Sequence, residues 1–327
     1  MNTRLVSPLF RRLAPAVGLF LLAPLVGEYL LGNFSIRQIL ALLFLAPMYG
    51  GGALLIREAT RLAGRGWHTM LLLALAYGVL QPSLIDHSMF NPPSLEGLDF
   101  RRAAYIPALD LSAAAAVAFP LGHAIWSIGV PIAVVESFVP ERRTKPWLGR
   151  FGLTAVVLVF LLGCALIFLG TLVTLPSAAE MIGASVAVLA LMVAAFLIRG
   201  RQRPKIRRPA PKPWLVGLAA FVASSLFFAK SETWPGIAFG LVLLVAMVIL
   251  IARWSRREGW SAAHRLALAG GALLTYAWGA SSSRRSTAAP AWSTWAATHS
   301  WPYAPSLCSL RPSARCAGPK GRHDSRG

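Results

Sequence analysis

Apolar runs long enough to cross a lipid bilayer recur along most of the chain, and no other feature limits its fold so strongly. A helix rises about 1.5 Å per residue, so a hydrocarbon core about 30 Å thick requires about 20 apolar residues. Every backbone N–H and C=O inside the bilayer must be paired within the protein, which favours helices for runs of this length. The predicted spans are 13–32, 39–56, 67–85, 112–139, 151–174, 181–198, 213–229, 235–252 and 264–280.

The chain is therefore predicted to be an all-α, polytopic bundle of about nine transmembrane helices. The last span is short and begins at His264 and Arg265, so the predicted bundle rests mainly on the first eight spans. Composition agrees, because 56% of the 327 residues are hydrophobic and only 13% are charged. Such a balance is far from that of soluble globular proteins.

Basic residues alternate between the two sides of this predicted bundle. If the N-terminus is cytoplasmic, the inner segments contain 21 Lys and Arg residues, and the outer loops up to residue 280 contain four. The positive-inside rule then predicts a multi-pass protein of the bacterial cytoplasmic membrane with its N-terminus inside. We expect the lipid bilayer as its partner, with anionic headgroups near the basic cytoplasmic loops. No nucleic-acid motif accompanies the net charge of +20, which excludes nucleic acid as a partner.

Two segments divide the chain by composition. Residues 199–212 combine Pro with dense positive charge, which predicts an extended linker between a six-span block, 1–198, and a three-span block, 213–280. The tail, 281–327, contains no Val, Ile, Met or Phe, and its seven basic residues would lie outside. It is either a disordered outer tail or the product of a reading-frame error, and the misplaced positive charge favours the error.

Ionisable groups at membrane depth are costly and are the first place to look for function. Glu28, Glu136 and Glu180 lie near the ends of predicted spans, where a carboxylate can reach the interface or an interfacial partner, so we assign them structural roles. No CxxC or Cys/His spacing typical of a metal site occurs, and no metal ion or cofactor is assigned.

A better cluster lies at the outer side of the third and fourth spans. Gln81 is about one turn inside the membrane, and Asp86 and His87 lie near its surface. Pro82 cannot donate a backbone hydrogen bond and clashes with the preceding turn, so the helix is expected to kink beside Gln81.

In the fourth span, His123 lies well inside the apolar run, and Ser127 follows on the same helical face. A buried histidine needs a hydrogen-bond partner, and Gln81 or Asp86 is the nearest by depth. One hypothesis is that Gln81, Asp86, His87 and His123 line a site for a metal ion or a polar substrate. The alternative is that His123 and Gln81 only hydrogen-bond two helices together.

Several segments resemble a group of uncharacterised multi-pass membrane proteins from high-GC Gram-positive bacteria. They are YGGGALLIREATRLAGRGW, LAYGVL, SMFNP, GHAIWSIGVPIAVVE and TKPWLGR. The resemblance covers about residues 10–278 and implies no established activity. Because it stops where the tail begins, it also favours the reading-frame error.

A more distant likeness is to the CAAX-protease and bacteriocin-processing (CPBP) family of intramembrane proteases. Phe119 and His123 satisfy its FxxxH motif, but Gln81 and Pro82 stand where the closer group often has an acidic pair. Glu58 is a single glutamate at the cytoplasmic end of the second span, far in depth from His123, and no histidine in a later span matches the third motif. The Glu and His groups that activate water in that family are therefore incomplete.

These observations predict a non-catalytic integral membrane protein, either an accessory component or a degenerate relative of a membrane enzyme. The first alternative is a transporter or lipid-handling protein with a polar site between spans three and four, because proline interrupts both spans near polar side chains. The second alternative is a CPBP-like intramembrane protease. No protein partner is identified from these residues.

Overall fold

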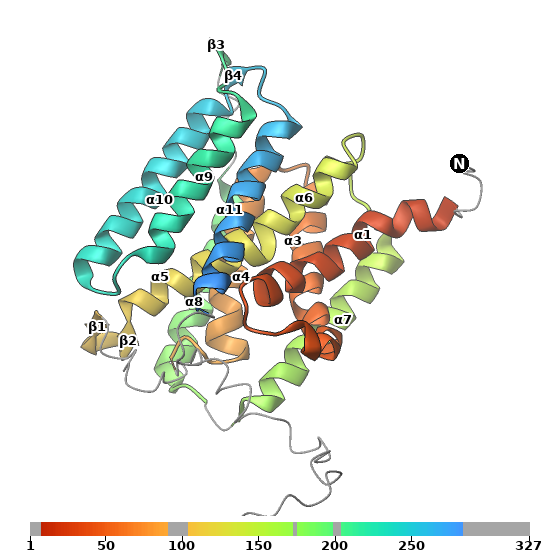
Figure 1. Ribbon diagram of the computed structural model, residues 1–327. Coiled ribbons are helices and arrows are strands. Elements are labelled where there is room, and N and C mark those ends of the chain that lie inside the picture. Colours follow the sequence, from red (N-terminus) through yellow and green to blue (C-terminus); the bar gives the residue numbers. More distant parts are fainter. Residues whose placement is uncertain (1–7, 91–103, 173–174, 199–203, 284–327) are drawn as a thin grey trace, which may run out of the picture.

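The chain folds into a bundle of long helices in a computed structural model that describes residues 8–90, 104–172, 175–198 and 204–283 (Figure 1). The first four predicted spans are each divided into shorter helical segments. In chain order these segments are α1 (Pro8–Pro24), η2 (Leu25–Leu30), η3 (Ile36–Ala41), α2 (Leu42–Leu45), η4 (Ala46–Gly50), α3 (Gly51–Leu62), α4 (Trp67–Leu80), η5 (Gln81–Ile85), α5 (Ala113–Gly122), η8 (His123–Gly129) and α6 (Val130–Phe138).

The later spans are continuous helices: α7 (Arg150–Gly170), α8 (Ala178–Leu197), α9 (Pro213–Ala229), α10 (Trp234–Trp254) and α11 (Ala262–Ser283). Short strands occur only in connections of the described chain. They are β1 (Tyr105–Ile106) with β2 (Leu111–Ser112), separated by the 3-10 turn η7 (Pro107–Leu109), and β3 (Ile206–Pro209) with β4 (Arg257–Glu258).

The predicted all-α membrane bundle is confirmed. Seven helical stretches of the described residues are long and apolar enough to cross a membrane, and they match predicted spans one to six and eight. The seventh predicted span is α9, an apolar helix of 17 residues, and the ninth lies within α11, a helix of 22 residues. The tail lies outside the described residues from residue 284 onward.

The second span is longer than expected, because it covers Ile36–Leu62 instead of 39–56. The predicted end of this span at residue 56 leaves Arg57 and Arg61 in a cytoplasmic loop, which is wrong: both lie within α3, with 0% and 8% of their surfaces exposed. Hydropathy ends a span at the first charged residues. Here the helix continues because other residues of the protein surround those charges.

Each of the first four spans contains one π-helical segment: η2, η4, η5 or η8. Proline lacks a backbone N–H and clashes with the carbonyl four residues earlier, so a helix cannot keep its regular bonding around it. At Pro82, where a kink is expected, the structure has the π-helical segment η5. A proline lies within or shortly before each segment: Pro24, Pro47, Pro82 and Pro120.

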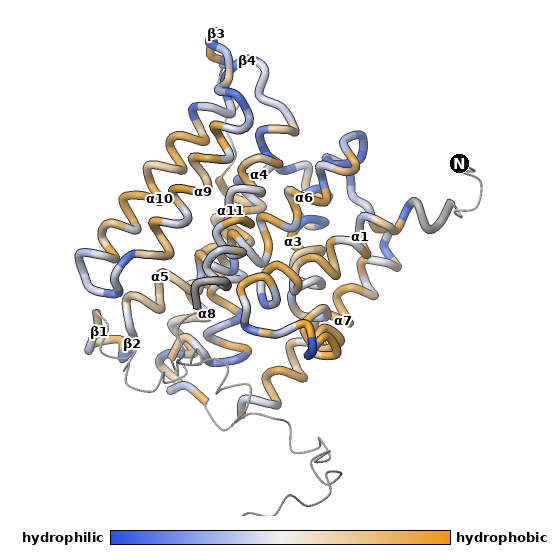
Figure 2. The backbone as a smooth tube through the Cα atoms, in the orientation of Figure 1, coloured by the Kyte–Doolittle hydropathy of each residue, from blue (hydrophilic) through white to orange (hydrophobic). Residues whose placement is uncertain are grey.

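The first four spans form the interior of the bundle, and later helices lie around them. Between 44% and 56% of the apolar window of each early span is buried, against 6% for α7 and 17% for α8 and α10. Figure 2 shows apolar residues along the whole length of α7 and α10. These exposed apolar faces suit contact with lipid acyl chains.

The helix α11 connects the two predicted blocks, because it packs against both α9 and α6 (Figure 1). The rings of Trp126 and Tyr276 stack with their centroids 4.6 Å apart, and the Trp126 indole N–H donates to the Ala272 carbonyl at 2.8 Å. Part of the predicted linker is extended: β3 pairs in parallel with β4. The linker is thus joined to the connection between α10 and α11.

Segments that the charge pattern assigns to the cytoplasm lie on one side of the bundle and contact one another. Arginine side chains make these contacts with backbone carbonyl oxygens of another such segment or, for Phe196, of the adjoining end of α8. The pairs are Arg142 with Arg12 at 3.1 Å, Arg65 with Phe196 at 2.8 Å and Arg256 with Pro204 at 3.1 Å. The alternation of the predicted loops therefore agrees with the packing of the helices. We call this the basic side, and the other the outer side.

Candidate functional site

Polar side chains from the four π-helical segments gather inside the outer half of the bundle. The segments contribute one polar residue each: Glu28 from η2, Tyr49 from η4, Gln81 from η5 and His123 from η8. Asp86 lies directly after η5 and accepts a hydrogen bond from Gln81. We call these five residues the outer polar cluster. π-Helical turns occur frequently at functional sites, where they re-aim side chains.

Glu28 lies inside the protein, with only 9% of its surface exposed. One carboxylate oxygen accepts a hydrogen bond from the Tyr49 hydroxyl, and the other accepts one from the Asn33 side-chain amide at 2.7 Å. We expected Glu28 to reach an interfacial partner from the end of its span. Asn33 is such a partner, but Tyr49 directs the carboxylate toward the bundle interior.

Tyr49 stands between Glu28 and His123. The Tyr49 and His123 rings stack with centroids 5.9 Å apart, and the Tyr49 Oη lies 3.4 Å from His123 Nε2. The other ring nitrogen, Nδ1, is 2.8 Å from the Phe119 carbonyl oxygen. A carbonyl oxygen only accepts, so Nδ1 carries a proton. Nε2 is then the nitrogen that can accept a bond or take a second proton.

Glu28, Tyr49 and His123 need one additional proton before all the hydrogen bonds among them can form. The Tyr49 hydroxyl has one proton, so with an ionised Glu28 and a neutral His123 it can bond only one of its two neighbours. Both contacts are satisfied if Glu28 is protonated and Tyr49 donates to His123. They are also satisfied if His123 takes a proton on Nε2 and donates to Tyr49. Each fully bonded arrangement holds one proton more than the starting state.

Gln81 and Asp86 bond each other, whereas depth in the membrane suggests one of them as the partner of His123. The Gln81 side-chain N–H donates to Asp86 at 2.7 Å, and the other carboxylate oxygen accepts from the backbone and hydroxyl of Ser88 at 3.0 and 2.7 Å. Gln81 is 2% exposed, and its Oε1 is buried without a hydrogen-bond partner. An unpaired buried acceptor costs about 1–3 kcal/mol, so this atom is suited to a donor from a bound molecule.

The other two predicted site residues face elsewhere. His87 has a backbone φ of 60°, is completely buried, and lies against α7: its Nδ1 is 3.3 Å from the Thr171 carbonyl, and its ring meets Phe168 edge-on. Ser127 is buried against Gly27, where an added Cβ would lie 2.7 Å from the serine Oγ. His87 thus joins spans three and five, and Ser127 joins spans four and one.

The two carboxylates of the outer polar cluster have no cationic counterpart. In the described part of the chain, no basic side chain forms an ion pair with Glu28 or Asp86. The acceptors and negative charge of the cluster favour a proton or a solute that carries N–H or O–H donors. No group of three potential metal ligands occurs among the described residues.

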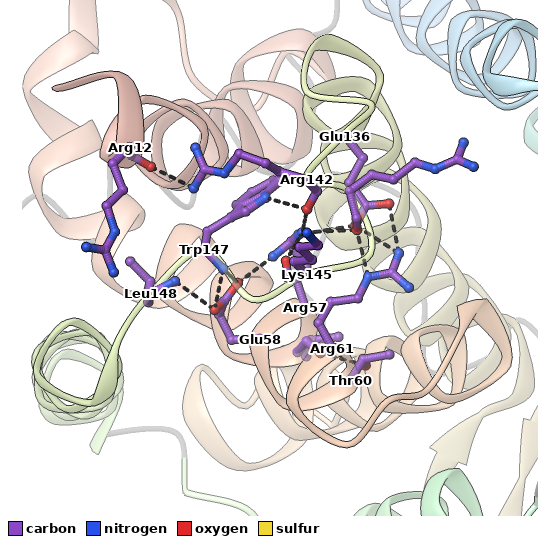
Figure 3. A network of polar contacts seen from close by, with 12 residues as sticks. Arg12, Arg57, Glu58, Thr60, Arg61, Glu136, Arg142, Lys145, Trp147 and Leu148 are labelled. Carbon is purple, nitrogen blue, oxygen red and sulfur yellow. Dashed lines mark hydrogen bonds and ion pairs between the residues drawn. The ribbon is translucent and has the colours of Figure 1, made fainter. Parts of the chain in front are cut away.

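A second buried polar network lies on the basic side (Figure 3). The Arg57 guanidinium binds the carboxylates of Glu58 and Glu136 and donates to three carbonyl oxygens of the connection between α6 and α7. It also lies 3.3 Å from the centre of the Trp147 ring. Arg61 donates to both oxygens of Glu136 at 2.9 Å. The interfacial pairing that we predicted for Glu136 is present.

Glu58 is fully occupied within this inner ion network. Besides Arg57, its carboxylate accepts from the backbone N–H groups of Trp147 and Leu148, at 2.9 and 3.0 Å. Tyr49 contacts His123 and lies nine residues before Glu58 on the same span, which is about 13 Å along a helix. Glu58 therefore cannot act with His123 on one substrate bond.

The third predicted structural glutamate, Glu180, caps a helix. Its carboxylate accepts from the Ser177 backbone N–H at 2.7 Å, while the Ser177 hydroxyl accepts from the Glu180 N–H at 3.3 Å. This reciprocal pair is a capping box at the start of α8. Its role is local.

Sequence reasoning missed Glu28 and Tyr49 as members of the cluster. A tyrosine within an apolar run is ordinary, and a glutamate near a span end has an easy interfacial explanation. The available signal was the pair of prolines, Pro24 and Pro47, which interrupt their spans a few residues before these side chains. Proline inside a span marks a place where side chains leave the regular helical pattern.

Comparison with known proteins adds a family but no activity. The sequence profile of an uncharacterized membrane protein family matches residues 18–307. No curated protein and no solved structure matches the chain. The family match extends past residue 278, where we expected the resemblance to stop. The extent of the family match therefore gives no support to a reading-frame error after residue 278.

Proposed function

The chain belongs to this uncharacterized membrane protein family, and we propose that it is a non-catalytic, transporter-type protein that binds a small polar solute together with a proton. One observation carries the proposal: four interrupted spans direct polar groups into one interior, including two carboxylates that form no ion pair with a basic side chain of the described residues. Transporters bind substrates where discontinuous helices meet within the membrane.

The proton and the solute are assigned to different parts of the cluster. Glu28, Tyr49 and His123 form a chain that is fully bonded when it holds one additional proton. Gln81 offers an unpaired acceptor beside Asp86, which suits a solute with N–H or O–H donors. We expect a charge gained in the proton chain to change the affinity of the solute site, because charges in the low-dielectric interior of one bundle act on each other over long distances.

We place the protein in a bacterial cytoplasmic membrane with its N-terminus inside, following the positive-inside rule. The resemblance to proteins of high-GC Gram-positive bacteria supports this location. In that orientation the outer polar cluster lies nearer the external surface. The solute would then enter from outside the cell.

Intramembrane proteolysis of the CPBP type is the second candidate. It is supported by the FxxxH pair and by Glu28, a carboxylate that reaches His123 through Tyr49. Against it, the Glu58 carboxylate is occupied in the inner ion network. Cleavage of a membrane-embedded peptide by the wild type, and its loss in His123→Ala, would replace our proposal with this one.

Thiol labelling tests access to the cluster. In a cysteine-free background, Gln81→Cys should react with a water-soluble, membrane-impermeant maleimide added from outside. The matched control is Ala74→Cys, two turns deeper on the same helix and completely buried. Equal protection of both positions would contradict a solute site open to water.

Infrared difference spectroscopy tests the proton. Between alkaline and acidic buffer, the wild type should change either its protonated-carboxyl band or its imidazolium band, depending on which group takes the proton. Glu28→Gln should abolish that change. The control is Glu180→Gln, which alters a capping carboxylate at the start of α8. An unchanged difference spectrum in Glu28→Gln would contradict the proposed proton chain.

A further inference from the structure

A shallow surface pocket lies on the basic side, beside the inner ion network and far from the outer polar cluster. It is too small to enclose a water molecule, so a bound group would lie at its mouth, against the side chains that line it. It opens between the first residue of α4, the end of α6 and the start of α11. Its polar lining consists of Trp67, Glu136, Ser137, Arg143 and Arg265. All three helices begin or end here, so the pocket lies at the level of the membrane surface.

Charge is unbalanced around this pocket. Arg57, Arg61, Arg143 and Arg265 bring four positive charges to it and to the adjoining network, against the two carboxylates of Glu58 and Glu136. Arg57 and Arg61 already bind both glutamates. Among the described residues, neither the Arg143 nor the Arg265 guanidinium has a hydrogen bond or an ion pair. The two positive charges that no carboxylate balances are therefore those of Arg143 and Arg265, which line the pocket.

Guanidinium groups that have no carboxylate partner are suited to binding phosphate. Arginine presents a planar set of donors that matches phosphate oxygens in pairs, and Arg143 and Arg265 come from two different elements. Trp67 adds an indole at the interface, where tryptophan is enriched in membrane proteins. Basic pockets between transmembrane helices on the cytoplasmic side bind anionic lipid headgroups.

Apolar surface beside the pocket favours a lipid over a free phosphate ion. Phe138, the last residue of α6, has 78% of its surface exposed, and Leu266, next to Arg265, has 42% exposed. Both can contact acyl chains while the headgroup lies between the arginines. We propose that this pocket binds the phosphate headgroup of an anionic phospholipid, such as phosphatidylglycerol, from the cytoplasmic leaflet.

The test compares purified protein in nanodiscs of phosphatidylcholine alone and with increasing phosphatidylglycerol, with thermal stability as the readout. The wild type should be stabilised in a saturable manner. In Arg143→Gln/Arg265→Gln the apparent affinity for phosphatidylglycerol should fall about 30-fold, which corresponds to about 1 kcal/mol for each basic residue near the surface. The matched control is Arg207→Gln/Arg208→Gln, which removes two exposed arginines from β3 in the basic linker and should lower the affinity less than the pocket variant does.

Two further measurements make the result unambiguous. The midpoint in phosphatidylcholine alone reports whether the double variant folds, and Arg265→Gln alone replaces it if it does not. Inorganic phosphate added to phosphatidylcholine nanodiscs distinguishes the two sources of phosphate. Stabilisation by inorganic phosphate equal to that by phosphatidylglycerol would overturn the lipid assignment. Equal affinity of wild type and pocket variants would overturn the site itself.

Discussion

The second span buries ionisable or hydroxyl-bearing side chains at two levels, and their surroundings differ. On the basic side, Arg57 and Arg61 meet Glu58 and Glu136, and each charged group has opposite charge within ion-pair distance. On the outer side, Tyr49 joins a cluster with two carboxylates, neither of which forms an ion pair with a basic side chain of the described residues. The inner ion network also binds backbone groups of a connection, whereas the outer polar cluster leaves the Gln81 Oε1 unpaired.

This difference separates a structural role from a functional one. A buried charge with all its partners fixes the position of helices, and removal of one partner leaves the other charge buried and unpaired. A buried polar group that lacks a partner lowers stability and persists where a ligand or proton completes it. We therefore expect substitutions in the inner ion network to change stability, and substitutions in the outer polar cluster to change binding.

Arg57→Ala should have the largest effect. It leaves Glu58 without its cation and Glu136 with Arg61 alone, and it removes the donor that holds three carbonyl oxygens, so a loss of about 3–5 kcal/mol is expected. The thermal midpoint in detergent is the measurement, with exposed Arg208→Ala as control. A shift no larger than that of the control would contradict a structural role for this network.

Arg61→Lys should have an intermediate effect. Lysine keeps the charge but cannot contact both Glu136 oxygens with a planar fork, and it loses charged hydrogen bonds worth about 1.5–3 kcal/mol. The same thermal measurement applies. If Arg61→Lys matched the wild type, charge alone and not geometry would account for the network.

Tyr49→Phe should cost about 1 kcal/mol, because one hydrogen bond to Glu28 is lost while the aromatic contact with His123 remains. Its effect on the proton signal should be larger, since the link between Glu28 and His123 is removed. Infrared spectra and thermal midpoints measured on one preparation separate the two effects. A loss of stability as large as that of Arg57→Ala would erase the distinction between the two regions.

Glu28→Gln should change stability least, by about 0.5 kcal/mol or less. The amide oxygen can still accept from Tyr49, and a rotated Asn33 amide can pair with the new N–H group. Proton uptake should nevertheless disappear. A strongly destabilised Glu28→Gln with normal proton uptake would show that this carboxylate serves the fold and not binding.

The helices were predictable because hydropathy and the length of a span are local properties of the sequence. The contact between Gln81 and Asp86 could be predicted for the same reason, since the two residues are only five positions apart in the sequence. The chain of Glu28, Tyr49 and His123 was not, because it joins three spans and depends on how each π-helical segment rotates its side chain.

Charged residues misled the prediction in a specific way. Arg57 and Arg61 end an apolar run, and such residues ordinarily lie in water beyond the membrane. Their partner Glu136 is 79 and 75 residues away, so nothing near them in sequence shows that they are neutralised. Tertiary pairing extends the span by about one and a half turns past the predicted end.

The separation between Arg57 and Glu136 also constrains biosynthesis. At about 5–20 residues per second, the ribosome needs about 4–16 seconds to add the 79 residues between them. During that time the second span has emerged with Arg57 and Arg61 but without Glu136. Arg57 and Arg61 lie near the inner end of this span, and without Glu136 their charges favour water or lipid headgroups over the protein interior. The inner end of the second span is therefore expected to pack into the bundle only after the fourth span has been synthesised.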